Sequence, residues 1–379
     1  MKILLVSELF PFCNNAGEVN IQGGGENHMY ALSRELAHDN DVAVLTSHVP
    51  QASYPSDRFP FRIHTIPNRK TAAHRSEDIR FALRLAKALR RLGSQFEVVV
   101  PQTFIPILSA FLSRPSASVV PIIHDVYQPL PLINGIAAWK NLQRGNTIRG
   151  IEGCLLERIC LNYASNCPLV LTVSDTSCQA LQRWIPREKI RVTGNGVYLD
   201  EFRRTSKDID LIAIARFDAP YKNIDLLCEA VIDSDIHTVI VGEGRLRPKI
   251  EQRYGGRNIQ FTGFVSDKVK RELLARSKVL ISASSIEGFG ITLLEGLASG
   301  CLVAASDIGP HRFIDQGFNV IRFFSVGDTK ALMNTVTELL TLSDVERNEL
   351  YQRANQLITQ HWQWSAIAHK TELFLRSLR

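Results

Sequence analysis

Residues 279–310 constrain the fold more than any other stretch of the chain. A β-rich apolar run opens the stretch, a glycine-containing turn follows at 287–290, and an apolar helical pattern then continues to Gly300. A second apolar run begins at Leu302. Strand, turn, helix, glycine stop and strand in this order predict a βαβ unit, whose two strands lie in one parallel sheet.

Two glutamates frame the turn of this unit. Glu287 precedes the helix, and Glu295 follows eight residues later, about 1.5 turns into the helix at 3.6 residues per turn. Parallel sheets bind ligands at the carboxyl ends of their strands, where carboxylates can accept hydrogen bonds from sugar hydroxyls and helix-terminal N–H groups can bind phosphate. The spacing alone fits equally a helix-capping acid followed by a solvated glutamate.

The motif Glu287-x7-Glu295, with Gly288-Phe289-Gly290 inside it, resembles the Glu-x7-Glu motif of the retaining glycosyltransferases of family 4, which have the GT-B fold. The resemblance implies an α/β protein in which two Rossmann-like domains face each other across a cleft and a C-terminal helix crosses back to the first domain. We therefore expect an acceptor-binding domain at 1–197, a nucleotide-sugar-binding domain at 198–360 and the helix at 361–379.

Two cations of the second half also fit this family. Arg216 and Lys222 resemble the arginine and lysine that hold the donor diphosphate, because fixed cations stabilise the charge of a leaving nucleoside diphosphate without a metal ion. They lie six residues apart, whereas the family usually has five, so Ala219 looks like an inserted residue and the loop is expected to bulge. Taken alone, Lys222 also fits a solvated lysine.

The same resemblance gives roles to residues around the turn. The amides near Phe289 and Gly290 would help to bind the diphosphate, and Glu295 would take the ribose hydroxyls. Glu287 would orient the donor sugar. The loop that contains Val265 would contact the nucleotide base, largely through its backbone.

The first half contributes two more candidates by resemblance. His124-Asp125 follows an apolar run that is predicted to be a strand at 119–123, and the family has His-Asp at this place, with the histidine beside the donor sugar. Gly24 and Gly25, before the first predicted helix, match the family's Gly-Gly turn, where the chain approaches the ligand diphosphate or the acceptor. The alternatives are a histidine that caps a strand end and a simple flexible turn.

Length and composition bound the class of protein. The chain of 379 residues is long enough for two domains, and its 45% apolar and 22% charged fractions are those of a soluble globular protein. No apolar run approaches the ~20 residues of a membrane span, and the N-terminus reads as a buried strand instead of a signal peptide. Seven cysteines without a CxxC pair indicate reduced thiols, so we expect a cytoplasmic protein.

The net charge of +6 arises entirely from the first half, where residues 1–195 hold 21 Lys and Arg against 15 Asp and Glu. A basic amphipathic helix predicted at 75–92 contributes to this charge. Such a domain suits an anionic partner, either a phosphate-bearing acceptor or the inner face of an acidic membrane. The alternative is an ordinary solvated basic surface, and no nucleic-acid partner is expected.

The predicted reaction is that of a hexosyltransferase, which moves a sugar with retention from a UDP- or GDP-sugar to a glycan, lipid-linked or small-molecule acceptor. No metal, no cofactor and no dedicated nucleophile are expected. A sugar phosphorylase, a nucleotide-sugar 2-epimerase and a non-catalytic nucleotide-sugar-binding protein remain as alternatives of similar shape. A nicotinamide oxidoreductase is disfavoured, because no intact glycine fingerprint is followed by an acid about 20 residues on.

Overall fold

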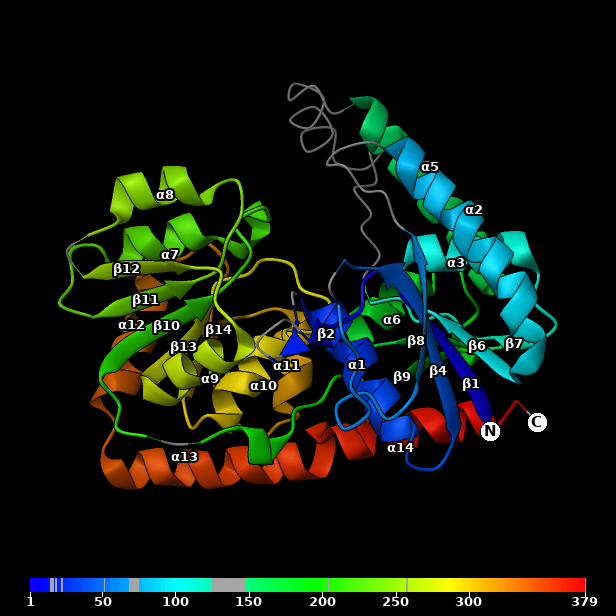
Figure 1. Ribbon diagram of the computed structural model, residues 1–379. Helices are drawn as coiled ribbons and strands as arrows, with labels where there is room; N and C mark the ends of the chain where they lie inside the picture. Colours follow the sequence, from blue (N-terminus) through cyan, green and yellow to red (C-terminus); the bar gives the residue numbers. More distant parts are fainter. Residues whose placement is uncertain are drawn as a thin grey trace. The chain divides into compact units, whose positions relative to one another are not determined.

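The computed structural model describes residues 1–13, 17, 19–21, 23–50, 52–67, 75–124, 147–203, 205–256 and 258–378. The chain falls into two compact units, Met1–Thr193 together with Ala368–Arg379, and Gly194–Ile367. Each unit is an α/β domain built on a parallel sheet (Figure 1). Asp125 and the segment up to residue 146 lie outside the described residues.

The first unit contains a five-stranded parallel sheet with the strand order β5-β4-β1-β6-β7. Two short strand pairs, β2 with β3 and β8 with β9, accompany it. The elements are β1 (Lys2–Val6), β2 (Phe12–Cys13), β3 (Val19–Asn20), α1 (Gly24–Leu36), β4 (Asp41–His48), β5 (Arg62–Pro67), α2 (Arg75–Leu92), η1 (Gly93–Gln95), β6 (Val98–Pro101), α3 (Phe104–Ser113), β7 (Ser118–Val119), α5 (Thr147–Asn166), β8 (Val170–Thr172), α6 (Asp175–Leu181), η2 (Arg187–Lys189) and β9 (Ile190–Val192).

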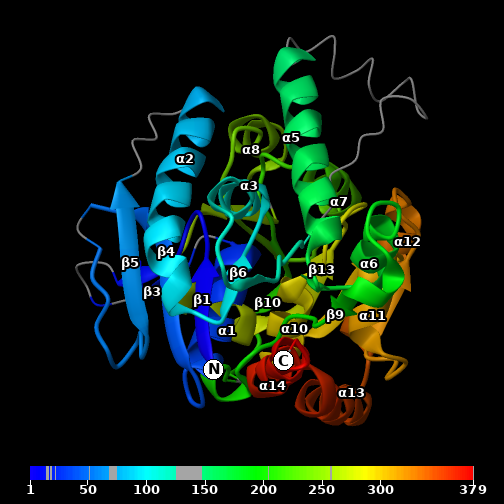
Figure 2. The ribbon, with the colours of Figure 1, turned by 90° about the vertical axis from the view of Figure 1, so that its right-hand side faces the viewer.

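The residues of β1 show how this sheet is buried on both faces. Leu4 and Val6 belong to an apolar cluster with α2 and α3, whereas Ile3 and Leu5 belong to a second cluster with α1 and the C-terminal helix α14 (Trp364–Arg376). Successive side chains of a strand face opposite sides, so a strand that is apolar throughout needs cover on both. Figure 2 shows α3 between α2 and α5, and α3 contacts both helices.

The strand predicted before His124 is shorter than expected, and a proline explains the difference. Strand β7 ends at Val119, because Pro121 has no N–H to donate to the ladder. The following backbone still pairs locally with β8: the Leu171 N–H donates to the Pro121 carbonyl at 2.8 Å, and the Ile123 N–H donates to the Leu171 carbonyl at 2.9 Å. His124 follows directly, at the carboxyl ends of the strands.

The second unit has a six-stranded parallel sheet with the order β12-β11-β10-β13-β14-β15. The elements are η3 (Leu199–Glu201), β10 (Ile209–Ile214), η4 (Pro220–Lys222), α7 (Ile224–Val231), β11 (Thr238–Val241), α8 (Arg247–Tyr254), β12 (Ile259–Gly263), α9 (Asp267–Arg276), β13 (Ser277–Ser282), α10 (Ile291–Ala298), β14 (Leu302–Ser306), α11 (Gly309–Asp315), β15 (Ile321–Phe324), α12 (Thr329–Thr341), α13 (Asp344–Leu357) and the π-helical turn η5 (Ile358–Trp362).

Numbered along the chain within this unit, the strand order is 3-2-1-4-5-6, which is the order of a doubly wound Rossmann sheet. Helices α7 and α12 pack together on one face of the sheet, and α9 and α10 cover the other (Figure 1). The order reverses between β10 and β13. Ligands of such sheets bind outside the carboxyl ends of the strands at this reversal, so the loops after β10 and β13 are where a site is expected.

Trp362, near the C-terminal end of the second unit, packs against several of its other segments. The Trp362 Nε1–H donates to the Ile314 carbonyl at 2.9 Å, and its indole ring packs edge-on against Phe289 and Phe313. Gly194 lies against the same ring with a φ of +91°, and a Cβ at this position would lie 2.6 Å from the indole. Both the backbone conformation and the space therefore require glycine here.

Helix α14 is divided between the two units. Its residues up to Ile367 group with the second unit, and Ala368 onward groups with the first. Ala368 and Leu375 lie in the apolar cluster that contains Ile3, and the Asn40 side-chain amide donates to the Glu372 carboxylate at 2.9 Å. The end of the chain is therefore part of the first unit's core.

Six of the seven cysteines are buried free thiols: Cys13, Cys160, Cys167, Cys178, Cys228 and Cys301. Burial raises the pKa of the Cys228 thiol to about 12, so this group stays protonated and unreactive at neutral pH. Across the described ranges, no helix has the length and apolar character that crossing a membrane requires.

We expect a Gly242→Ala substitution to destabilise the second unit strongly. Gly242 has a φ of +139°, and a Cβ there would lie 1.8 Å from the Ala215 carbonyl oxygen. Gly327 has a φ of +82° but nothing within 4 Å of its Cβ position, so Gly327→Ala serves as a matched control for backbone strain alone. Denaturant unfolding should show a loss of about 2–5 kcal/mol for G242A and about 1–2 kcal/mol for G327A. Equal losses of unfolding free energy in the two variants would show that the Ala215 carbonyl oxygen does not exclude a Cβ at position 242.

Candidate active site

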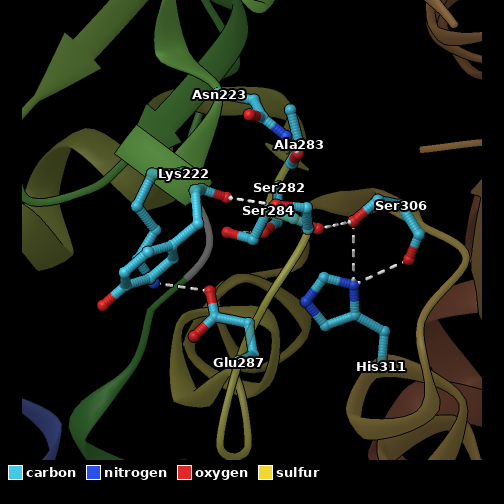
Figure 3. A network of polar contacts seen from close by, with 10 residues as sticks. Lys222, Asn223, Ser282, Ala283, Ser284, Glu287, Ser306 and His311 are labelled. Atoms are coloured by element: carbon cyan, nitrogen blue, oxygen red, sulfur yellow. Dashed lines mark hydrogen bonds and ion pairs between the residues drawn. The ribbon is translucent and has the colours of Figure 1, made fainter. Parts of the chain in front are cut away.

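The candidate residues of the second unit gather at the carboxyl ends of its strands. Arg216 is exposed after β10, Val265 follows β12, and Glu287 lies in the loop after β13. Parallel strands share one carboxyl edge, so residues far apart in the sequence come together there. Figure 3 shows part of this edge, with Lys222 and Glu287 directed toward each other.

The loop between β10 and α7 absorbs the additional residue without losing its anchor points. Ala219 is buried and caps the short helix η4. The Ser285 N–H donates to the Tyr221 carbonyl at 2.8 Å, and the Asn223 side-chain amide donates to the Ala283 carbonyl at 2.9 Å. These two bonds tie the loop to the end of β13, so the longer spacing still presents a lysine to the loop that follows that strand.

Lys222 and Glu287 form an ion pair across the two loops. The Lys222 ammonium lies 2.5 Å from Glu287 Oε1, and the two side chains are 18% and 13% exposed. Partial burial reduces solvent screening, so this pair is stronger than an ordinary surface pair. A dianionic ligand that approaches Lys222 would compete with the carboxylate for the same ammonium group.

The glycine turn after Glu287 begins helix α10. Gly290 caps the helix with a φ of +99°, a left-handed conformation that favours glycine. The Phe289 side chain is buried against Trp362 and Phe313, so its backbone amide is the part that can serve a ligand. The N-terminus of α10 therefore offers backbone donors beside the ion pair.

Glu295 is held by a lysine that the sequence analysis did not identify. Glu295 is 5% exposed, and its Oε1 lies 2.7 Å from the Lys270 ammonium, which also lies 2.8 Å from Asp267. Burial alone lowers the pKa of Lys270, but both carboxylates stabilise its ammonium form and the pKa lies above its ordinary value. Among the described residues, Glu295 Oε2 has no hydrogen-bond partner.

His311 is a second residue that the sequence analysis did not assign to the site. The structure buries it completely beside Gly290. Its Nδ1 lies 2.8 Å from the Ser306 carbonyl oxygen, while Nε2 has no partner among the described residues (Figure 3). Burial lowers the pKa of His311 although the nearby Glu287 raises it, so the ring is neutral at pH 7.

The first unit brings His124 and Gly25 together through Gln102. The Gln102 Nε2 donates to the Gly25 carbonyl at 2.8 Å and lies 2.5 Å from His124 Nε2. The His28 ring meets the His124 ring edge-on, with 4.8 Å between the centroids. Burial, and then the proximity of His28, holds the pKa of His124 well below its usual value. Gly24 and Gly25 form the first turn of α1.

Weak sequence signals marked these additional residues. Gln102 is a polar residue directly after an apolar strand, and Asp267 and Lys270 are three residues apart on one helix. His311 follows a Gly-Pro step that begins a helix. None of these patterns predicts which residue the side chain contacts. Both Gln102 and Lys270 have hydrogen-bond partners on other elements of the structure.

Solved structures share the fold across the whole chain. The sucrose-phosphate synthase of Thermosynechococcus elongatus aligns with a TM-score of 0.78 and 17% identity, covering 99% of this chain and 98% of that chain. HepE of Anabaena, in complex with UDP and glucose, aligns with a TM-score of 0.74 and 16% identity over 100% of both chains. The two Rossmann-like units and this likeness define a GT-B fold.

Sequence comparisons identify the family. Residues 22–201 match the family model described as Glycosyltransferase Family 4, and residues 208–342 match the one described as Glycosyl transferases group 1. The chain belongs to the group 1 glycosyltransferases of the GT-B type, because these two models together match most of its length.

Curated relatives match over shorter stretches. The chain is 31% identical over 167 residues to the phosphatidyl-myo-inositol mannosyltransferase of Mycobacterium leprae, which is 42% of this chain and 44% of that protein. It is 34% identical over 125 residues to the O-antigen chain mannosyltransferase C of Escherichia coli, which is 31% of this chain and 34% of that protein. The similarity covers less than half the length of either relative.

We expect Lys270→Met to destabilise the second unit, because it leaves the buried Glu295 carboxylate without its counter-ion. The loss should be about 3 kcal/mol in denaturant unfolding, and the double variant K270M/E295L should recover much of it. Arg276→Met removes a cation whose partner, Asp208, is about half exposed, and should have a much smaller effect. Equal losses for K270M and R276M would show that the buried pair has no special role.

Proposed function

We propose that this protein is a retaining glycosyltransferase that transfers a hexose from a nucleotide-sugar, a UDP- or GDP-sugar, to a glycan, lipid-linked or small-molecule acceptor. The observation that carries the proposal is the Lys222–Glu287 ion pair beside the N-terminus of α10. This arrangement places a cation, a carboxylate and backbone donors at one sheet edge. Those are the groups that a sugar diphosphate needs.

The cations act on the leaving group. As the bond between the anomeric carbon and the phosphate oxygen breaks, negative charge develops on the diphosphate. Arg216 and Lys222, with the amides of Phe289 and Gly290, stabilise that charge more in the transition state than in the bound substrate. They supply positive charge from the protein, so the proposed transfer needs no metal and no cofactor. Addition of EDTA should leave the rate unchanged.

The carboxylates orient the donor. When the diphosphate takes over Lys222, Glu287 becomes an acceptor for a hydroxyl of the donor sugar. Glu295 has one oxygen on Lys270 and a second oxygen without a hydrogen-bond partner among the described residues, which suits a ribose hydroxyl. The backbone near Val265 contacts the base. We also propose that His124 contacts the donor sugar.

The reaction proceeds on one face of the sugar. The acceptor hydroxyl forms a new bond to the anomeric carbon while the bond to the diphosphate breaks, and the hydroxyl proton passes to the departing phosphate oxygen. The products are a glycoside with the donor's anomeric configuration and a free nucleoside diphosphate. Release of a 2-epimer, or a requirement for inorganic phosphate, would instead identify an epimerase or a phosphorylase.

A thermal-shift panel of UDP-, GDP- and ADP-sugars tests donor binding. The correct donor should stabilise the protein by about 2.7 kcal/mol when present at 100 times its Kd. Hydrolysis and transfer assays on the binders then test turnover. A protein that binds a nucleotide-sugar but never releases the nucleoside diphosphate would be a binding protein, and the proposed activity would be wrong.

We expect Glu287→Ala to reduce kcat by about 10²- to 10³-fold while nucleotide binding is retained. Binding of the free nucleoside diphosphate should be at least as tight as in the wild type, because Lys222 no longer has a competing carboxylate. Glu338→Ala, which removes a glutamate that is 58% exposed in the same domain, is the matched control and should keep the wild-type rate. An unchanged rate in E287A would remove Glu287 from the mechanism.

We further propose that the first domain contacts an anionic membrane at the cytoplasmic face. Ile79 and Leu83 are four residues apart on α2 and are 55% and 53% exposed, and the helix is basic along its length. Exposed apolar side chains on a basic helix suit the interface of a bilayer that contains acidic lipids.

The variant I79D/L83D should bind vesicles of phosphatidylserine and phosphatidylcholine about tenfold more weakly than the wild type. Val345→Asp is the matched control, since Val345 is 69% exposed in the second domain. Cosedimentation measures both. Equal binding of I79D/L83D, V345D and the wild type would reject the membrane contact.

A further inference from the structure

Gln102 occupies the point of the first domain where the strand order reverses. It follows β6, and Ser7 follows β1, the neighbouring strand on the other side of the reversal. The Ser7 hydroxyl donates to the Leu9 carbonyl at 2.6 Å and lies 3.3 Å from Gln102 Oε1, and Gln102 is 1% exposed. The side-chain amide is therefore fixed at the place where sheets of this kind bind ligands.

The contacts of Gln102 determine which end of its amide faces His124. The Gly25 carbonyl oxygen lies 2.8 Å from the atom assigned as Nε2, and a carbonyl oxygen can only accept a hydrogen bond. The opposite orientation would place two carbonyl oxygens against each other. The amide nitrogen therefore points to Gly25, and its two hydrogens are directed to Gly25 and to His124.

We propose that Gln102 is a positioning residue that holds His124 in the neutral tautomer with the proton on Nδ1. Because Gln102 Nε2 is a donor and lies 2.5 Å from His124 Nε2, the histidine nitrogen must accept and cannot carry a proton. The ring then presents Nδ1–H as its one donor. The Ser177 hydroxyl donates to the His124 carbonyl at 2.8 Å and fixes the backbone of the same residue.

This tautomer has a consequence for the proposed transfer, on which the kinetic part of the inference rests. The sugar ring gains positive charge as the leaving group departs, and an imidazolium ion nearby would oppose that charge. A neutral ring can instead donate a hydrogen bond without repelling the reacting centre. His28, on α1, is the titratable group that faces the His124 ring within the described residues, and its proximity also favours the neutral form.

The tautomer itself can be measured without any substrate. In protein labelled with [¹⁵N]histidine, long-range ¹H–¹⁵N spectra should show His124 with a pyridine-type Nε2 and a protonated Nδ1 from pH 6 to 8. The signals are assigned by their loss in His124→Asn. In Gln102→Leu, a form with Nε2 protonated should appear. A protonated Nε2 in the wild type, or identical His124 signals in Q102L, would overturn the proposal.

The pH dependence of kcat/KM supplies the second test. Gln102→Glu replaces the donor by a carboxylate, which accepts from Nε2–H and stabilises the imidazolium. The pKa of His124 then rises, so activity is lost at a higher pH on acidification, with a shift of about 1–3 pH units. Gln95→Glu, at an exposed position in the turn η1 that precedes the same strand, is the matched control for added charge. Identical acid limbs in Q102E and Q95E would reject the proposal.

Loss of the hydrogen bond alone has a smaller expected effect. Gln102→Leu should lower kcat/KM about tenfold at neutral pH, because the ring is no longer restricted to one tautomer. Failure of this inference and failure of the proposed function are distinguishable. A wild-type protein without turnover but with the expected ¹⁵N pattern would reject the transferase activity and leave the tautomer assignment in place.

Discussion

The ion pair between Lys222 and Glu287 organises the site of the second domain. It joins the loops that follow β10 and β13, the two strands between which the order of the sheet reverses. Two backbone-anchored contacts hold the first loop against the second, so the lysine reaches the carboxylate despite an additional residue at Ala219. The pair neutralises both charges, and in the proposed reaction the donor diphosphate would replace the carboxylate at Lys222. It also brings the cation and the acid to the start of α10, where both can engage one ligand.

The first domain has neutral groups at the point where its strand order reverses, in the place where the second domain has an ion pair. Ser7 and Gln102 follow β1 and β6, the strands at its own reversal point, and their side chains lie in contact, with 3.3 Å between Ser7 Oγ and Gln102 Oε1. Gln102 then links the glycine turn of α1 to His124. In both domains, a side chain that follows one central strand is fixed by a group that follows its neighbour. One reversal point therefore carries charged groups, to which the proposed function assigns a diphosphate, and the other carries neutral hydrogen-bonding groups.

Local patterns in the sequence were sufficient to predict many elements. The basic helix at 75–92 has the predicted bounds, and the strand, turn, helix and strand predicted within 279–310 are present as β13, α10 and β14, because amphipathic periodicity and short apolar runs report on the elements that contain them. The strand before His124 was predicted too long, since Pro121 interrupts a run that is otherwise apolar. Lys270, His311 and Gln102 could not be predicted as site residues. Their roles depend on partners brought together by the sheet, such as Glu295, which is 25 residues from Lys270.

The packing of Trp362 links two segments that evolution could otherwise alter separately. Its indole fills the space beside Gly194, where the chain enters the second domain, and it also supports the Phe289 side chain in the glycine turn. A larger residue at position 194 requires a different local backbone conformation and also a smaller residue at 362, and that exchange would remove the support of Phe289. Substitutions at these three positions should therefore be inherited as a set among close relatives, even though the positions span most of the second domain.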